Sequence, residues 1–538
     1  MNHLRIVCFV FLAFLMSQGS LRGEQRPTKK PNILFLFADD LGYYASCFSD
    51  KERPGVNDVI YTPAIDQLAL EGVSFNHAYV NVPSCTPSRA SVATGCYFWR
   101  CGRSANLRGG EWEGVEDPGD RLVGFGTLLQ EEGYHTGRTY KTLETRWFPG
   151  KVYQDAGTDF CRYSQTLDAA ASMEEGHAVL KQELLDNFHA FLADRVEGQP
   201  FCYVWGPHNP HRPWIQGSGK RIWGIEPDDL KGKMPGHLPD TYEVREDFAD
   251  YLGEVQAFDR GVQYLVEELR KMGELENTLI VLSGDNGIPG FTRGKCNLYD
   301  FGVRTPLVMR WGGIKHTNRK LDDFVNLVDL APTLLETAGI LPPEAMDGKS
   351  LVPLLKSRKN GLVDSARDHV IVGRERHMPQ GREGNLPYPS RAIHTKDFIY
   401  IRNFKPDRSP MGSTADLDPD RVSSAYESLK EYTKTRETEF KDLDNSPTKA
   451  VIVTRREDPD FASYFELGFG LRPLEELYDL RTDPDQLTNV AGFAEYEKIR
   501  KELEDKLLST LKETHDPRID DLFDHIPYVE NPANIITP

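Results

Sequence analysis

The chain has 538 residues, of which 39% are hydrophobic and 27% charged, and its formal net charge is −18 at pH 7. One hydrophobic core does not usually extend over so long a chain, so we expect two domains or one large domain with a smaller lobe. The acidic balance argues against nucleic acid as a partner, because phosphate binding depends on Lys and Arg. A small anionic substrate is still compatible with it if basic residues converge on one pocket.

The N-terminal segment predicts a signal peptide over residues 1–23. Residues 1–5 are basic, residues 6–16 are almost wholly apolar, and residues 17–23 supply small and polar residues, which is the pattern of a secretory signal. The apolar run is too short to span a bilayer. We therefore expect a secreted or periplasmic protein without stable membrane insertion, and an uncleaved N-terminal anchor is the alternative.

Three apolar runs that end in polar loops are predicted to be buried parallel strands: residues 32–38, 200–205 and 278–283. Amphipathic stretches between them predict helices at residues 64–71, 125–132, 173–195 and 251–272. This alternation predicts an α/β fold with a mostly parallel sheet covered by helices on both faces. Ligands of such folds bind beyond the carboxyl ends of the strands.

Acidic and amide side chains follow two of these strands. Asp39 and Asp40 come directly after the first strand, and Asp285 and Asn286 follow the third. They offer only oxygen ligands, so a hard divalent cation such as calcium is favoured over zinc or copper. Each pair alone could instead cap a helix or form a common turn. Their joint position at strand ends favours a metal site.

The segment Ser84-Cys85-Thr86-Pro87-Ser88-Arg89, with Thr94-Gly95 beyond it, contains the most informative motif of the chain. It resembles the signature of the type I, formylglycine-dependent sulfatases. The resemblance implies that a formylglycine-generating enzyme oxidises Cys85 to an aldehyde during export, and that the aldehyde hydrate attacks sulfur. Pro87 can fix the turn that presents this group, and Arg89 can hold its charge. The alternative is a buried structural Cys before a proline turn.

The resemblance extends over almost the whole chain and implies an alkaline-phosphatase-like fold. The family carries an Asp-Asp pair after its first strand, an Asp-Asn pair after a later strand, and the modified Cys as a further calcium ligand. The matching residues here are Asp39, Asp40, Cys85, Asp285 and Asn286. Asp285 is also a candidate base for the attacking hydroxyl.

Cationic residues match the family's sulfate-binding positions. Lys141 ends the run 133–141, His211 lies in the Pro-His-rich loop 207–213, and Lys295 follows the Asp-Asn turn. The resemblance implies that they and Arg89 neutralise the sulfuryl oxygens, and that His211 or Lys295 protonates the leaving group. With Cys85, these residues are the expected catalytic set. Lys295 could instead be a solvated loop cation, and His208 fits the family pattern less well.

Two residues depart from the family pattern. Tyr140 replaces a Gly, and Leu143 replaces a His that helps to expel sulfate from the enzyme. Three explanations stay open: another base serves, Lys151 marks a different alignment, or turnover is weakened.

The C-terminal part predicts an α+β subdomain with an antiparallel sheet. Residues 390–395 and 398–403 are a predicted strand pair, and residues 474–491 resemble the family's closing hairpin. We place a catalytic domain at residues 31–365 and a C-terminal subdomain at residues 366–538. Residues 405–456 are charged and rich in turns, which predicts a surface excursion.

Short matches at residues 285–289, 297–299 and 513–517 make the heparan N-sulfatase group the most similar subgroup. The resemblance implies an enzyme that hydrolyses sulfate ester or sulfamate groups of a sulfated carbohydrate, such as N-sulfoglucosamine of heparan-like glycans. The alternatives are a phosphodiester or phosphonate hydrolase of the same fold, and a protein that binds sulfated glycans without catalysis.

Two sets of residues have open roles. Loop residues Arg374, Arg376 and His377 could frame the sugar, although a solvated surface run is the favoured interpretation. Six further cysteines could form disulfides in an oxidising compartment or remain buried thiols: Cys47, Cys96, Cys101, Cys161, Cys202 and Cys296.

Overall fold

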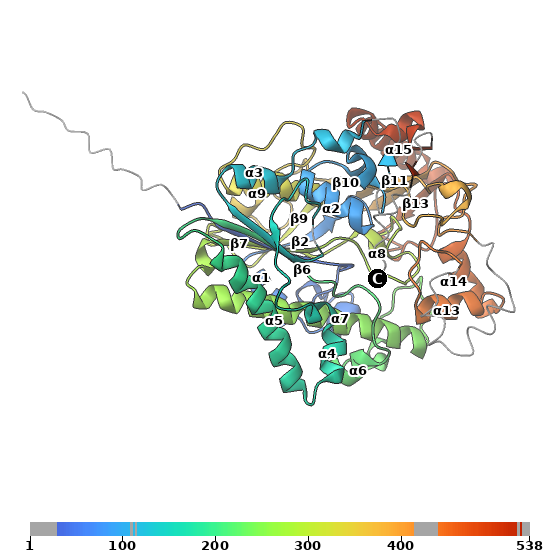
Figure 1. Cartoon of the computed structure of the whole chain (residues 1–538). Coiled ribbons are helices and arrows are strands. Elements are labelled where there is room, and N and C mark those ends of the chain that lie inside the picture. The colour runs from blue at the N-terminus through green and yellow to red at the C-terminus, as the bar shows by residue number, and fades with distance from the viewer. Residues whose placement is uncertain are drawn as a thin grey trace, which may run out of the picture.

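The computed structural model describes residues 29–107, 111–112, 116–141, 143–413, 439–524 and 528–529. The predicted signal peptide lies outside these residues. Figure 1 shows a central sheet with helices on both faces and a second sheet beside it. Within the described ranges, no helix combines the length and the hydrophobicity that a membrane crossing requires.

The central sheet has eight strands in the order β5-β4-β6-β1-β7-β8-β2-β9. β8 runs antiparallel to its neighbours β7 and β2, and the other neighbours pair in parallel, so the predicted mostly parallel sheet is confirmed. The strands are β1 (Asn32–Ala38), β2 (Val73–Tyr79), β4 (His135–Tyr140), β5 (Lys151–Val152), β6 (Phe201–Gly206), β7 (Thr278–Gly284), β8 (Leu307–Arg310) and β9 (Arg319–Asn326).

Strand β1 shows why the sheet is covered on both faces. All of its residues are buried, and because side chains alternate along a strand, they contribute to two apolar clusters. Leu34 and Leu36 face the cluster that contains α1, α5 and α7, whereas Phe35 and Phe37 face the cluster that contains α2, α3 and α9. Figure 1 shows these two groups of helices on opposite sides of the sheet.

The helices of this part are α1 (Pro63–Leu70), α2 (Cys85–Thr94), α3 (Phe125–Glu131), α4 (Tyr163–Ala169), α5 (Met173–Ala193), α6 (Ser218–Trp223), α7 (Tyr242–Lys271), α8 (Asp300–Val303), α9 (Leu330–Thr337) and α10 (Val352–Lys356). α7 begins well before the predicted start at residue 251. Its first turns bury charged residues, including Arg245 and Asp247, which interrupt the apolar pattern that sequence analysis depends on. Asp247 is paired with Arg212 at 2.8 Å.

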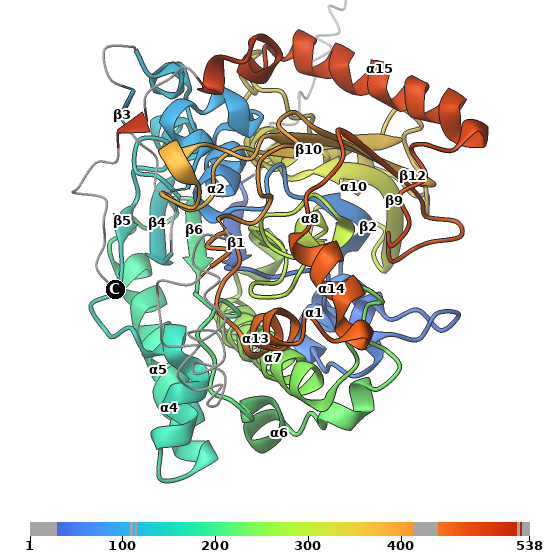
Figure 2. The ribbon, with the colours of Figure 1, turned by 90° about the vertical axis from the view of Figure 1, so that its right-hand side faces the viewer.

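The second sheet is antiparallel, with the order β10 (His369–Arg374), β11 (Ser390–Thr395), β12 (Phe398–Asn403) and β13 (Glu475–Asp479). Helix α15 (Glu497–Glu513) buries Leu503, Leu507 and Leu511, which recur every four residues, in one cluster with residues of this sheet. Figure 2 shows α15 along this sheet at the top of the view. Helices α13 (Pro447–Thr454) and α14 (Pro459–Phe469) lie before β13, and β3 (Glu111–Trp112) pairs with β14 (Tyr528–Val529).

The expected closing hairpin is wrong in one respect. β13 is its first strand, but the return segment is not a strand: the Val490 N–H donates to the Leu477 carbonyl at 2.8 Å without a ladder. The two sheets share an apolar core, because Val370 and Ala392 belong to the same cluster as Phe35. The domain division at residues 365 and 366 stays a prediction. All seven cysteines of the described residues are free thiols.

Candidate functional site

The parallel pairing of β1 and β7 brings the two acidic turns together. Ala38 lies opposite Gly284 at the carboxyl ends of these strands, so Asp39 and Asp285 follow side by side. The Asp40 N–H donates to Asp285 Oδ1 at 2.9 Å. Asp40 has a φ of 65°, a left-handed conformation that turns the chain sharply at the strand end.

Cys85 joins these residues from the first turn of α2. Its Sγ lies 3.6 Å from Asp39 Oδ1 and 3.8 Å from Asp40 Oδ1. Ligand atoms of Asp39, Asp40, Cys85 and Asp285 all lie within 4.8 Å of one another, and all four residues are buried. This group is called the acidic cluster below.

The acidic cluster fits a hard cation. Asn286 Nδ2 donates to Asp40 Oδ1 at 2.6 Å, but its buried Oδ1 has no hydrogen-bond partner among the described residues. Unmet buried oxygens are unfavourable, and carboxylate and amide oxygens are the ligands that calcium prefers. The five residues expected to hold the metal are therefore brought together, with a ligand atom of Asn286 still available.

Three buried or half-buried cations pair with the carboxylates. Lys141 Nζ lies 2.5 Å from Asp39 Oδ1, Lys295 Nζ lies 2.9 Å from Asp40, and Arg89 Nε lies 2.7 Å from Asp285 Oδ2. Burial alone would raise the pKa of Asp39, but Lys141, His211 and Arg89 outweigh it and hold that pKa well below its usual range. Asp40 raises the pKa of Lys295 well above its usual value, against the effect of burial. The charged forms of Asp39 and Lys295 are thus stabilised.

The site opens on the side of Lys141 and two histidines. His211 Nε2 lies 3.6 Å from Asp40 Oδ2, and the His211 side chain is 31% exposed. The Lys141 side chain is 24% exposed, and His208 is exposed at the same mouth. Surrounding protein atoms, together with Lys141 and His211, lower the pKa of His208 to about 4, although Asp39 opposes this. His208 is therefore neutral near pH 7, with one ring nitrogen that carries no proton.

The loop that carries His211 is fixed from α7. Asn209 Nδ2 donates to the buried carboxylate of Glu254. Residue Arg212 on the other side of His211 is held by Asp247, also on α7. The two contacts hold His211 beside Asp40.

The unmodified Cys85 thiol is a weak nucleophile. Burial raises its pKa to about 12, although Lys141 and Lys295 oppose this. Thiolate, and not thiol, is the nucleophilic form of cysteine. Direct attack by this sulfur is therefore disfavoured near neutral pH.

The two departures from the family pattern are structurally distinct. Tyr140 has a φ of 62°, a region in which Gly is favoured, and its hydroxyl donates to Glu183 Oε1 at 2.5 Å. Leu143 is buried in an apolar cluster. Lys151 does not join the site, because it is exposed on β5 and pairs with Asp194 at 2.9 Å. The alternative alignment through Lys151 is therefore wrong.

Two residues of the C-terminal part reach the site: Asp444, which no sequence pattern indicated, and His377, which was expected only as a candidate to frame the sugar. Asp444 Oδ2 lies 3.9 Å from Lys295 Nζ, so the expectation that residues 405–456 are only a surface excursion is wrong for this residue. His377 Nδ1 lies 2.9 Å from the Ser84 hydroxyl, next to Cys85. No local pattern indicates contacts between residues so far apart in the chain.

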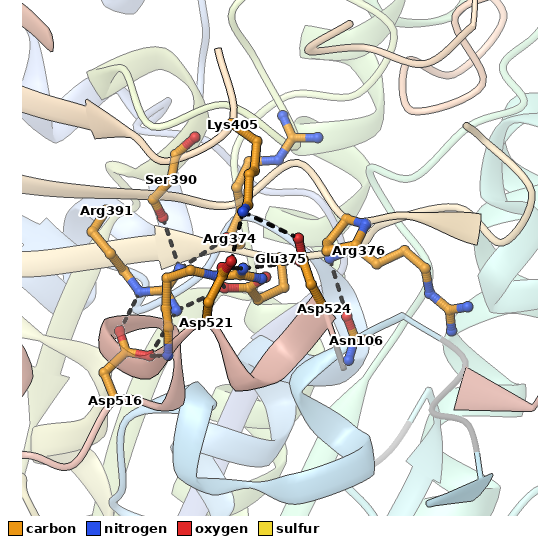
Figure 3. Close-up of polar contacts among 12 residues, drawn as sticks. Asn106, Arg374, Glu375, Arg376, Ser390, Arg391, Lys405, Asp516, Asp521 and Asp524 are labelled. Carbon is orange, nitrogen blue, oxygen red and sulfur yellow. Dashed lines mark hydrogen bonds and ion pairs between the residues drawn. The ribbon is translucent and has the colours of Figure 1, made fainter. Parts of the chain in front are cut away.

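The interpretation of Arg374, Arg376 and His377 as a solvated run is also wrong, because all three are buried. Figure 3 shows the network around this segment, in which Arg391 bonds Glu375 and the Arg376 N–H donates to Asn106 Oδ1 at 3.0 Å. Arg374 pairs with Asp442 at 3.0 Å. Ion pairing offsets the cost of burying these charges, which composition alone does not reveal.

Comparisons with known proteins agree with the motif. A family model described as Sulfatase matches residues 31–340, and a model described as N-sulphoglucosamine sulphohydrolase, C-terminal, matches residues 293–445. The chain is 27% identical to the N-sulphoglucosamine sulphohydrolase of Homo sapiens, over 94% of this chain and 93% of that protein. It is 25% identical to an ulvan-active sulfatase of Formosa agariphila, over 93% of this chain and 79% of that protein.

A solved structure of a protein in complex with its substrate D-glucosamine-2-N,6-O-disulfate has a TM-score of 0.58 to this chain at 20% identity. The match covers 92% of this chain and 100% of that chain. At this identity the likeness shows the fold alone, which is the expected alkaline-phosphatase-like architecture.

Proposed function

Because the chain belongs to the sulfatase family, we propose that it releases sulfate from a sulfated carbohydrate, with residue 85 as the site that attacks sulfur. The observation that carries this proposal is the position of Cys85. Its side chain lies against two carboxylates of the acidic cluster, and Lys141 and Lys295 pair with those same carboxylates. An anion held by the two ammonium groups would lie next to residue 85.

We propose that a formylglycine-generating enzyme converts Cys85 during export, which the N-terminal pattern over residues 1–23 supports. A neutral buried thiol has little reactivity of its own, so conversion gives this position a chemical role. Formylglycine hydrate would supply a nucleophilic hydroxyl, and a calcium ion held by Asp39, Asp40, Asp285 and Asn286 would supply positive charge next to it.

The other residues have separable tasks. Asp285 accepts the proton of the attacking hydroxyl, which suits a carboxylate whose pKa is raised by burial against the opposing effect of Arg89. Arg89, Lys141 and Lys295 neutralise the oxygens of the sulfuryl group. His211 lies on the open side and protonates the leaving oxygen or nitrogen.

We assign to His208 the proton transfer that helps to expel sulfate, in place of the His that Leu143 replaces. Leu143 is enclosed in an apolar cluster, whereas His208 is exposed at the mouth of the site and neutral near pH 7. His208 belongs to the same loop as His211, and their ring centroids are 6.5 Å apart. The two histidines can therefore serve the two halves of one turnover.

The proposed substrate group is N-sulfated glucosamine at the end of a heparan-like chain. The similarity to the human N-sulphoglucosamine sulphohydrolase and the match over residues 293–445 support this choice. That match contains Lys295, His377 and Asp444, which all reach the site or its immediate surroundings.

The test uses protein co-expressed with a formylglycine-generating enzyme. Peptide mass spectrometry should detect an aldehyde at residue 85, and sulfate should be released from an oligosaccharide with a terminal N-sulfoglucosamine. Cys85→Ala should lower kcat/KM at least 1,000-fold, on the order of the loss of a catalytic nucleophile, while Cys47→Ala, which lies outside the acidic cluster, should not. Substantial activity in Cys85→Ala would end the formylglycine assignment. Hydrolysis of O-sulfated galactans alone would leave the family assignment and remove the N-sulfated substrate.

A further inference from the structure

A cavity of about 850 Å³ lies outside the acidic cluster. Its walls come from residues 43–58, the loop 232–237 before α7, residues 299–304 around α8, and the turn 484–486. Binding sites for small molecules typically have volumes of roughly 300–1,000 Å³. No member of the acidic cluster lines this cavity.

Packed aromatic rings separate the cavity from the acidic cluster. Tyr44 lines the cavity, and its ring packs edge-on against Tyr251 with 5.7 Å between centroids. On the other side of that contact, the Tyr251 hydroxyl donates to the Asp40 carbonyl at 3.1 Å. Phe301, another lining residue, packs against Phe291. A ligand in the cavity would therefore occupy a site distinct from the one that holds sulfate.

The lining has a positive balance in a chain whose net charge is −18. Its acidic side chains are Asp50, Asp58, Asp300 and Asp485. Its cationic side chains are Lys51, Arg53, Lys233, Arg293, Arg304 and Lys320. Arg304 is partly engaged, because its Nε donates to the Asn76 carbonyl at 3.0 Å, whereas Lys51 is exposed at the rim. A locally positive cavity in an acidic protein favours an anionic ligand.

Two histidines of the wall have ring nitrogens that find no hydrogen-bond partner in the part of the chain that the structure describes. His237 is 4% exposed, and neither of its nitrogens is bonded; its ring packs edge-on against Phe301 at 4.6 Å. His77 Nδ1 is likewise unbonded, and the His77 ring stacks on Phe324 at 4.4 Å.

The chemistry of these histidines indicates the kind of ligand. Burial lowers the pKa of His77 to about 4 and that of His237 well below its usual value. Both rings are therefore neutral near pH 7, and a neutral imidazole offers one N–H donor and one acceptor nitrogen. A hydroxyl group can satisfy both kinds of atom, and the lining residue Tyr44 adds aromatic surface to the cavity.

We propose that this cavity binds an anionic sugar unit of a glycan chain, at a site separate from the one that holds the reacting sulfate group. The inference rests on the proposed function, because it assigns the cavity to a more distant unit of the same kind of glycan. Its hydroxyls would bond His237 and His77, and its carboxylate or sulfate would face Lys51 and Lys233. The cavity would then favour chains over single sugars.

The test measures binding by calorimetry in the full-length Cys85→Ala protein, which prevents turnover. The probes are a heparin octasaccharide, a hyaluronan octasaccharide that carries carboxylates but no sulfate, and neutral maltooctaose. The variants Lys51→Glu/Lys233→Glu and His237→Leu should weaken heparin octasaccharide binding at least tenfold, and maltooctaose should not bind. If these variants also weaken hyaluronan binding, a carboxylate is sufficient for recognition in the cavity. If the protein with the unchanged cavity binds heparin but not hyaluronan, sulfate is the recognised anion.

The matched control reverses two lysines of α15, Lys498→Glu/Lys501→Glu, which are exposed and do not line the cavity. Heparin binding that weakens no more in the cavity variants than in this control would overturn the proposal. The surface lysine variant keeps the test valid if His237→Leu does not fold. In protein with an intact Cys85, Lys51→Glu/Lys233→Glu should leave kcat/KM for a small aryl sulfate within twofold. If the wild-type protein releases no sulfate, that result would instead count against the proposed function.

Discussion

At residue 85 and around it, the charges of the site form a balanced set. The carboxylates of Asp39, Asp40 and Asp285 pair with Lys141, Lys295 and Arg89. Each of these cations is also an expected sulfate ligand. A divalent ion on the carboxylates would release the two ammonium groups from their ion pairs, so that they could turn toward an anion. Metal binding and sulfate binding should therefore be mutually favourable.

This coupling predicts the effect of Asp39→Asn. The substitution keeps the shape of the side chain but removes one of three carboxylates that would hold the ion, so bound calcium should fall from about one per chain to about one tenth or less, as expected for a lost metal ligand. Activity should fall by about 100-fold or more for the same reason. Metal analysis by mass spectrometry and sulfate release check the two effects together. Asp322→Asn, an exposed Asp on β9, is the control.

Full metal content in Asp39→Asn would show that Asp39 is not a ligand. Loss of metal with retained activity would show that the ion is structural. The two readouts therefore separate the binding role of Asp39 from its catalytic consequence.

His208→Ala should slow the second half of turnover. The first half of turnover, in which the leaving group is released, should be unchanged because His211 and Lys295 are unchanged. One equivalent of product per active site should therefore appear as a burst. The following steady state should be slower by about 100-fold, since a positioned general acid–base group contributes roughly 100- to 10,000-fold. Stopped-flow measurement with an aryl sulfate records both phases. A proportional loss of burst and steady state would instead place His208 in the first step.

The residues of the site differ in how far sequence predicts them. Cys85, Arg89 and the acidic pairs lie in short local motifs, and the strand ends that follow buried runs bring them together. His377 and Asp444 reach the same place from distant segments whose local sequence looks solvated. Tertiary ion pairing, which no local pattern encodes, determines their burial.

Among the secondary-structure elements, α7 carries much of the support for the site and the sheet. Asp259 on this helix accepts hydrogen bonds from the N–H groups of Ile65 at 2.8 Å and Ala64 at 3.3 Å, so it caps α1 from another element. Burial raises the pKa of Asp259 to about 7, although these hydrogen bonds oppose it.

The raised pKa gives a pH-dependent contribution with a defined sign. Between about pH 4 and pH 7 the folded state holds the Asp259 proton more tightly than the unfolded state does, so the contribution of this group to stability decreases as pH rises. Its size is about 1.4 kcal/mol for each pH unit of the window. Asp259→Asn should remove this slope, so the difference in free energy of unfolding between wild type and variant should change steadily over the window.

Chemical denaturation at several pH values between 4 and 8 measures this difference. Glu502→Gln, an exposed carboxylate on α15, should show no comparable change. A wild-type-minus-variant difference that stays constant with pH would mean that Asp259 is ionised throughout and that its capping bonds outweigh burial.

The positions of elements were easier to predict than their ends. β1 and α3 follow the expected ranges closely, because their apolar patterns coincide with their lengths. α7 was predicted too short because paired charges are buried in its first turns. At the end of β4, Tyr140 adopts a backbone conformation in which Gly is favoured, and its hydroxyl donates to Glu183 on α5. The local sequence around Tyr140 does not indicate this contact.

Over the whole molecule, the two sheets and the C-terminal segment are joined by buried charge as well as by apolar packing. Arg391 on β11 bonds both Glu375, next to the end of β10, and Asp516, beyond α15. Arg518 also bonds Glu375. All four side chains are completely buried or nearly so. The fold class followed from the alternation of strands and helices, but this network could not, because its members come from three distant segments.

The network links the C-terminal end of the chain to the site. Glu375 lies between Arg374, which donates to the carbonyl of Cys296 beside Lys295, and His377, which contacts Ser84 beside Cys85.

Arg391→Met should therefore lower both stability and activity. The side chain keeps much of its volume but leaves the buried Asp516 without its cationic partner and Glu375 with Arg518 alone, and breaking a buried pair in this way costs about 3–5 kcal/mol. The free energy of unfolding and sulfate release at a temperature well below the transition measure the two effects separately. Lys501→Met, which breaks an exposed ion pair on α15, should leave both unchanged. A destabilised Arg391→Met that keeps wild-type kcat/KM would show that the network supports the fold without positioning the site.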